Sequence, residues 1–288
     1  MRDIFNNRKS ISYNNLEWLC IKVPFILFFL LLSSRILLGY SKITFPVALC
    51  TFGCCDWILI YPIKIFVLII LMLFSVTYIF EYKMNATLGF LSIISVIVFS
   101  LEESNGIMNR ASLISMVFIA QWIAYLLYHK QSNKLIANRI QFSIQLVVAT
   151  YMLSAISKLV TSGINWVSDS QYAVLQIQKS IYYNFYDSTN LNFILDGNQF
   201  VQYIDQHGTF FRFLFLSALI IEFTVFIALF NKKTRILYGL LLLSMHIGIF
   251  VVMDIIIPHV FIPMILLFLN PIYFLVSFLK WTFNQLKR

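Results

Sequence analysis

Eight apolar stretches run through the chain, each of roughly the length that crosses a bilayer as a helix. A helix needs about 20 apolar residues to span the hydrocarbon core. Ala86–Leu101 is the shortest stretch, and a ninth apolar segment, Ile43–Trp57, is expected to be re-entrant or interfacial. The eight expected spans are Leu16–Gly39, Trp57–Phe80, Ala86–Leu101, Ala111–Tyr128, Arg139–Val160, Phe210–Phe230, Ile236–Met253 and Val260–Phe278.

The scarcity of charge argues against a water-facing surface. Of the 288 residues, 60% are hydrophobic and 11% are charged, whereas soluble domains carry about 45–50% apolar and about 25% charged residues. The sequence therefore predicts an all-α polytopic transmembrane helix bundle, organised as a single domain over residues 1–288. The first apolar stretch is too long for the h-region of a signal peptide and contains Arg35, so we expect a signal anchor.

The net charge of +9 is concentrated at the ends of the apolar stretches. No basic patch interleaved with base-stacking aromatics accompanies it, so we expect no nucleic-acid partner. Eight spans place four basic clusters on one side, which the positive-inside rule makes cytoplasmic. Both termini would then be cytoplasmic, in a multipass protein of a bacterial inner membrane. The clusters are Arg2, Arg8 and Lys9; Lys130, Lys134 and Arg139; Lys232, Lys233 and Arg235; Lys280, Lys287 and Arg288.

The loop from Thr161 to Thr209 is the only sizeable segment outside the expected spans, and it falls on the outer side. It carries one lysine, Lys179, against several aspartates, which agrees with that side. Tyr and Trp favour the membrane interface, so we expect the loop to lie on the outer surface and cap the bundle. Its aromatic residues include Trp166, Tyr172, Tyr182, Tyr183, Phe185 and Tyr186.

Lys158 lies near the outer end of the fifth expected span. A lysine at such a position either snorkels, with its stem along lipid and its ammonium in water, or points into the bundle. Desolvation inside the bundle favours the neutral amine, which can act as a general base. Tyr151 and Ser154 precede it on the same helix face and would form a polar stripe leading to it.

Two further ionisable residues lie deeper in expected spans. His246 is about 11 Å from the outer end of the seventh, at 1.5 Å per residue, too deep to reach water. It is either a neutral histidine bonded to a neighbouring helix or a proton-relay or ligand-binding group. Glu222 lies near the middle of the sixth span, and His246 is a candidate partner for it. The alternative for Glu222 is a structural hydrogen bond between helices.

Other polar residues have less specific interpretations. Arg35, towards the outer end of the first span, either snorkels outward or pairs inside the bundle. Gly39, four residues later, would permit close helix approach. Asp254 and His259 flank the turn between the last two spans, and we interpret them mainly as turn and interface residues in reach of water.

Three of the four cysteines, Cys50, Cys54 and Cys55, fall in the first outer loop, where an oxidising environment permits one disulfide. The favoured pair is Cys50 with Cys54, and Cys55 is the alternative partner of Cys50. Cys20 is expected to stay reduced. Apart from Asp56, no histidine or carboxylate accompanies the cysteines, so no metal site is predicted.

Several short motifs, in order along the chain, resemble the HTTM superfamily, the membrane domain of the vitamin K-dependent gamma-carboxylase. They are RILLG at Arg35–Gly39, S-K-L followed by Trp166, I-I-E ending at Glu222, the K-K-T-R turn, and H-I-G-I-F-V-V-M-D-I beginning at His246. The resemblance covers most of the chain. It implies a transmembrane domain of that kind.

The resemblance also implies chemistry for individual residues. Lys158 matches the lysine that deprotonates vitamin K hydroquinone, although its spacing to Trp166 is slightly longer, and His246 resembles a helix histidine of the family. The implied catalytic residues are Lys158, His246 and Glu222, with Arg35 and Trp166 as cofactor-binding residues. The implied cofactor is a quinone or hydroquinone, and the family reaction is carboxylation of a glutamate.

One departure leaves two functions open. The animal carboxylase has a large lumenal domain that binds a propeptide, and no counterpart of it is present in these 288 residues. A shorter branch of the superfamily is an accessory membrane subunit that matures a secreted bacterial toxin peptide, and its first outer loop also carries cysteines. The chain is therefore expected to be either a carboxylase-like membrane enzyme or a non-catalytic subunit for maturation or export of a small secreted peptide.

Overall fold

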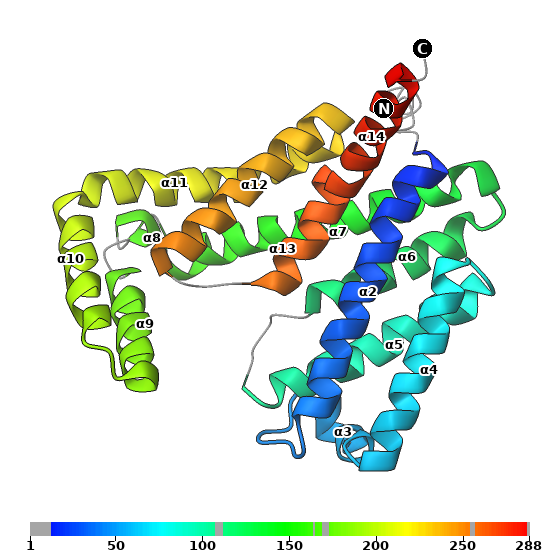
Figure 1. Cartoon of the computed structure of the whole chain (residues 1–288), viewed down its shortest axis with the longest axis horizontal. Coiled ribbons are helices and arrows are strands. Elements are labelled where there is room, and N and C mark those ends of the chain that lie inside the picture. The colour runs from blue at the N-terminus through cyan, green and yellow to red at the C-terminus, as the bar shows by residue number, and fades with distance from the viewer. Residues whose placement is uncertain (1–12, 107–111, 164, 169–172, 254–256, 287–288) are drawn as a thin grey trace. The chain divides into compact units, whose positions relative to one another are not determined.

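A computed structural model describes residues 13–106, 112–163, 165–168, 173–253 and 257–286, and within them the chain is helical without β-strands (Figure 1). The predicted all-α class is confirmed. The chain divides into two compact units, one formed by Met1–Val147 with Pro258–Arg288 and the other by Val148–Ile257. The boundary falls inside one helix, α7 (Ser132–Ser162). We call these the terminal unit and the central unit.

The terminal unit is built from long apolar helices that pack on an aromatic core. Phe118 packs against Phe25 and Phe29, with ring centroids 5.1 and 4.9 Å apart. All three side chains are buried. Its elements are α2 (Asn15–Gly39), η1 (Ala48–Phe52), α3 (Cys54–Ile58), α4 (Tyr61–Ile79), α5 (Met84–Glu103), α6 (Ser112–Tyr128), the first part of α7, α13 (Pro258–Met264), η4 (Ile265–Leu269) and α14 (Pro271–Leu286).

The last predicted span of the terminal unit is a bent helix pair. Pro258–Leu269 and Pro271–Gln285 meet at an angle of 40°. Asn270 sits between them in the left-handed conformation, with φ of 47°, and its side chain donates a hydrogen bond to the Glu17 carbonyl at 3.0 Å. Pro271 follows, and a proline cannot supply the N–H that would continue the preceding helix. The sequence therefore places the bend at Asn270.

The central unit contains the remainder of α7 and the segment predicted as the long outer loop. That segment is not a loop but two helices, α9 and α10, preceded by one short turn of helix. Its elements are α8 (Asn165–Ser168), α9 (Ala173–Ser188), α10 (Asn192–Gln206), α11 (Gly208–Thr224), η3 (Val225–Leu229) and α12 (Lys232–Met253).

Helices α9 and α10 pack along each other as a hairpin (Figure 1). Ile177 of α9, Ile204 of α10 and Phe211 of α11 form a small buried core. A Cβ at Gly197 would collide with the Ile181 side chain, so this glycine lets the two helices approach closely. This pair was not predicted from the sequence, although the helical spacing of Val174, Ile177 and Ile181 is a signal for it.

Among the described residues, six helices are long and apolar enough to cross a membrane, and the bent pair counts as a seventh if it is one span. All eight predicted spans correspond to helices, but α6 has only 17 residues and is the short apolar helix of the set. Many apolar side chains on these helices are exposed, including Leu153, Val160 and Phe213 at 64%, 81% and 64%. Such surfaces suit lipid and not water, so the chain is an integral membrane protein.

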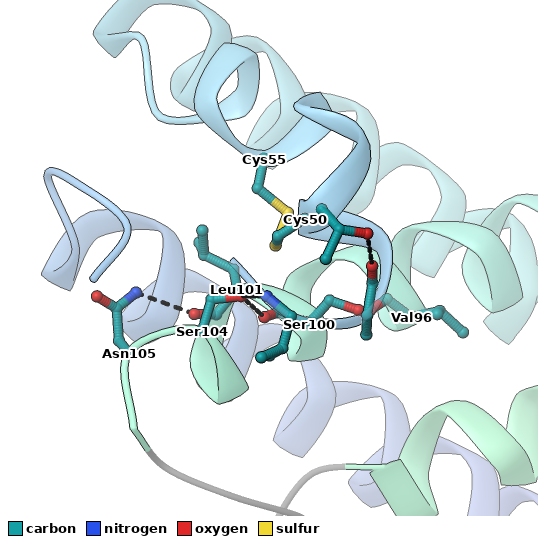
Figure 2. The surroundings of a disulfide bond; sticks show 10 residues. Cys50, Cys55, Val96, Ser100, Leu101, Ser104 and Asn105 are labelled. Carbon is teal, nitrogen blue, oxygen red and sulfur yellow. Dashed lines mark hydrogen bonds between the residues drawn. A yellow bond between two sulfur atoms is a disulfide. The ribbon is translucent and has the colours of Figure 1, made fainter. Parts of the chain in front are cut away.

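The cysteine loop is closed by a disulfide and is held against the end of α5 by hydrogen bonds (Figure 2). Cys50 pairs with Cys55 and not with Cys54, and their Cα atoms are 4.9 Å apart. Gly53, with φ of +76°, turns the chain between η1 and α3, which a residue with a Cβ would do at a cost. Ser104 anchors the loop, because its hydroxyl accepts from the Val47 N–H at 3.1 Å. Cys20 is a buried free thiol in α2.

Candidate functional site

Lys158 and Glu222 form an ion pair between two helices that qualify as spans. Lys158 Nζ on α7 lies 2.5 Å from Glu222 Oε2 on α11. The Glu222 side chain is 6% exposed and the Lys158 side chain 25% exposed. A charge at such a place is costly unless it is paired, and truncating one partner leaves the other charge uncompensated. The contact brings the two residues together within the apolar part of the central unit.

Trp166 of α8 completes the surroundings of the ammonium. Lys158 Nζ lies 4.9 Å from the centroid of the Trp166 ring, within the range of a cation–π interaction. The ring in turn packs against Phe215 of α11, with centroids 5.2 Å apart. The Lys158 ammonium therefore contacts both a carboxylate and an aromatic ring. Neither contact places it in open water, as simple snorkelling would require.

Tyr151 and His246 form a second polar contact between α7 and α12. The Tyr151 hydroxyl lies 2.7 Å from His246 Nε2, in a hydrogen bond whose donor depends on the histidine tautomer. Their rings meet edge-on at 5.9 Å. Tyr151 is buried and His246 is partly buried. The histidine therefore bonds a neighbouring helix, as one of its two interpretations expected, but its partner is not Glu222.

Helix α7 joins the two contacts on one face. Tyr151 and Lys158 are seven residues apart, which is two helical turns or about 10.5 Å along the axis. Ser154 lies between them on the same face, three residues after Tyr151 and four before Lys158. We call the four residues Lys158, Glu222, Tyr151 and His246, which come from α7, α11 and α12, the polar site.

The polar site leaves three of the candidate residues to be described. Arg35 belongs to the terminal unit and is exposed near the C-terminal end of α2. His259 also belongs to the terminal unit, where it is buried 6.3 Å from the Phe28 ring, so its interpretation as a residue in reach of water is wrong. Asp254 lies outside the described residues. No group of three metal-binding side chains occurs in the part of the chain that the structure describes.

The terminal unit holds a polar cluster that the sequence analysis missed. Glu81, in the turn between α4 and α5, accepts from Trp18 Nε1 at 2.5 Å and from Lys22 Nζ at 3.1 Å. Arg139 NH1 lies 3.6 Å from the same carboxylate oxygen. The Arg139 side chain is 1% exposed and its guanidinium lies 4.7 Å from the Trp18 ring. We call Glu81, Trp18, Lys22 and Arg139 the Glu81 cluster.

The electrostatics of Glu81 follow from these neighbours. Partial burial by itself would raise the pKa of the carboxyl, but the Trp18 hydrogen bond and the charges of Arg139 and Lys22 outweigh it. The pKa of Glu81 therefore lies below its ordinary value. The sequence carried a signal for this cluster, because Lys22 interrupts an apolar span and Glu81 is an acid between two apolar helices. Arg139 was instead interpreted only as an anchoring charge.

Comparisons with known proteins do not identify the chain: no protein-family model, no curated protein and no solved structure matches it.

Proposed function

We propose that the chain is a membrane enzyme in which Lys158 acts as a general base toward a lipid-soluble weak acid. The observation that carries the proposal is the contact between Lys158 and Glu222, a lysine and a carboxylate sharing a short hydrogen bond inside an apolar helix bundle. Membrane-embedded ionisable residues are costly and commonly serve function. The lysine end of the pair is accessible, because Lys158 is partly exposed whereas Glu222 is nearly buried.

Proton transfer within the pair would make base chemistry feasible. When the proton resides on Glu222, Lys158 is a neutral amine with a free lone pair. That amine can take a proton from an acidic O–H group, and the electron pair of the broken bond stays on the substrate oxygen. The product is an ammonium beside a neutral carboxylic acid. The new ammonium then stabilises the substrate oxyanion, and this electrostatic stabilisation is strongest where water is scarce.

The substrate class follows from the surroundings and from the resemblance to the HTTM superfamily. Lys158 faces the Trp166 ring, which offers an aromatic surface for a flat ligand. A hydroquinone is such a ligand, since it is aromatic, lipid-soluble and weakly acidic. In this proposal Tyr151 and His246 support the site from two turns away. Both termini are cytoplasmic, and the polar site lies toward the opposite side of the cell membrane.

The test uses the purified full chain in detergent with a naphthohydroquinone probe under anaerobic conditions. The absorbance of the probe reports whether it is ionised. Wild type is expected to ionise the bound probe at a pH where the free probe is neutral. The double variant Lys158→Met/Glu222→Gln removes both charges together and avoids an unpaired one. It should bind the probe without ionising it, and equal ionisation by both proteins would refute the proposal. Mass spectrometry of copurified lipids would reveal a natural quinone.

The second candidate is an accessory subunit for maturation or export of a small secreted peptide. The observation that favours it is the loop closed by Cys50 and Cys55, because the similar accessory branch also carries cysteines in its first outer loop. Lys158 and Glu222 would then only hold helices together. Under this candidate the double variant keeps full function in cells, and a small peptide, not a quinone, copurifies with the chain.

A further inference from the structure

The hairpin of α9 and α10 has two outer faces of opposite character. One face of each helix is turned inward onto the small core of Ile177, Ile204 and Phe211. The outward face of α9 is apolar and aromatic, and the outward face of α10 is polar. Helices α9 and α10 are adjacent in sequence and in space, so the contrast is local (Figure 1).

The aromatic face follows one side of α9. Leu175, Lys179, Tyr182 and Tyr186 are spaced four, three and four residues apart, which aligns them on one helix face. Tyr186 is 77% exposed and Tyr182 is 49% exposed. Tyr183, beside this stripe, is also exposed. We call Leu175, Tyr182, Tyr183 and Tyr186 the tyrosine face.

The outward side of α10 has a different composition. Among its described side chains, it consists mainly of uncharged polar residues together with Asp205, all of them exposed. Leu195 and Tyr203 are its large exposed hydrophobic residues, and Tyr203 stacks on His207 with ring centroids 4.2 Å apart. The exposed polar residues are Asn198, Gln199, Gln202, Asp205 and Gln206.

We propose that the tyrosine face of α9 lies in the lipid headgroup region and that the outward face of α10 points to water. Tyrosine places an apolar ring against acyl chains and a hydroxyl in the polar region, which is why it is enriched at membrane interfaces. Lys179 stands within the stripe as its single positive charge and complements lipid phosphates. Asp187, at the end of α9, lies to the side of the stripe.

The chain connections favour lipid over a protein partner for this face. Candidate span α7 ends at Ser162 and candidate span α11 begins at Gly208, so both ends of the segment are attached at a membrane face. Phe211 ties the hairpin core to α11, while Phe213 of the same helix is 64% exposed as a lipid-facing residue would be. The tyrosine face thus belongs to a segment that is packed onto a helix with a lipid-facing surface. An amphipathic helix at this position lies in the interface plane.

The experiment uses the full chain in lipid nanodiscs, with one environment-sensitive fluorophore on one introduced cysteine. The background is Cys20→Ser/Cys54→Ser, which keeps the Cys50–Cys55 disulfide. The test positions are Tyr182→Cys and Tyr186→Cys, and the matched controls are Gln199→Cys and Gln202→Cys. All four side chains are exposed, so substitution leaves the hairpin core intact.

Each labelled protein is challenged with two quenchers, a lipid spin-labelled near its headgroup and aqueous iodide. For a helix in the interface plane, the lipid spin label should quench the fluorescence at the two tyrosine positions about twofold or more above that at the glutamine positions. The tyrosine positions should also be protected from iodide. The glutamine positions should show the reverse. Equal iodide access at all four positions would overturn the proposal. So would protection of the tyrosine positions from both quenchers, because a protein surface would then cover them.

Discussion

The Glu81 cluster of the terminal unit and the polar site of the central unit arrange their charges in opposite ways. In the Glu81 cluster two cations, Lys22 and Arg139, and the Trp18 indole converge on one oxygen of one carboxylate. In the polar site Lys158 pairs with Glu222, and Tyr151 hydrogen-bonds His246. Several donors on one carboxylate favour its ionised state, whereas a lysine and a carboxylate that face each other can exchange a proton.

The two regions also differ in how they enclose their cations. Arg139 is 1% exposed and lies over the rings of Trp18 and Tyr78, so neither solvent nor a substrate reaches its guanidinium. Lys158 keeps one side accessible. Arginine stays charged in essentially every protein site, whereas lysine can lose its proton when it is desolvated. We therefore expect the Glu81 cluster to stabilise the fold, whereas the polar site has the features that the proposed chemistry requires.

The largest expected effect on stability comes from Glu81→Gln. The substitution leaves Lys22 and Arg139 without a counter-charge, which costs about 3–5 kcal/mol for a buried pair and less here because Glu81 is 34% exposed. Thermal unfolding in detergent measures the loss. The control is Asp56→Asn, which neutralises an exposed carboxylate of the same unit. If both variants melt at the wild-type temperature, the Glu81 cluster does not stabilise the fold.

Glu222→Gln should destabilise the protein more than Lys158→Met/Glu222→Gln does. The single change leaves the Lys158 charge uncompensated, whereas the double change replaces the pair by groups without charge. We expect the single variant to lose about 1–3 kcal/mol and the double variant to recover most of it. Thermal unfolding of the two variants and of Lys158→Met completes the cycle. Additive losses would mean that the two residues are not coupled.

Tyr151→Phe tests the hydrogen bond to His246 with a smaller expected effect. Hydrogen bonds between membrane helices contribute about 0.6 kcal/mol on average and at most about 1.7 kcal/mol. The variant should therefore remain folded and lose stability within that range. Tyr238→Phe is the matched control, because its hydroxyl donates to Thr224 at 2.9 Å in the same unit but outside the polar site. Only Tyr151→Phe should alter ionisation of the naphthohydroquinone probe.

The smallest expected effect is the loss of folding stability at acid pH. Because the folded-state pKa of Glu81 lies below its ordinary value, ionisation of Glu81 stabilises the folded state at pH values above that ordinary value. This contribution is lost as the pH falls through the folded-state pKa. Wild type should therefore lose stability in the acid range more steeply than Glu81→Gln. Melting temperatures of both proteins between neutral pH and the acid limit measure the difference, and parallel curves would contradict it.

The sequence predicted the fold class well, because apolar stretches near span length leave a chain few alternatives to helices in lipid. All eight stretches correspond to helices. Their number as spans was less predictable, since α6 falls short and the last span bends at Asn270. The hairpin of α9 and α10 was not predicted, although Val174, Ile177 and Ile181 have helical spacing, because the many aromatic and polar residues of the segment favoured a loop at the membrane surface.

The residues of the candidate site could be predicted from the sequence, but the contacts between them could not. Lys158, Glu222 and His246 stand out because charge is rare in apolar spans. The contacts among them depend on the rotation and depth of three helices. The spacing of residues within one helix does not determine that rotation or depth. The sequence suggested His246 as the partner of Glu222, whereas Lys158 occupies that place and His246 bonds Tyr151. The sequence placed Tyr151 on the helix face of Lys158, but its pairing with His246 was not predicted.

The most direct test of the central claim is Lys158→Arg in the naphthohydroquinone assay. Arginine keeps the charge and the ion pair with Glu222, so the protein should fold and reach normal membrane levels. It cannot become a neutral base, and the nearly buried Glu222 is shielded from the probe. The account predicts that the variant binds the probe and leaves it neutral. A Lys158→Arg variant that ionises the bound probe as fully as wild type would contradict the account.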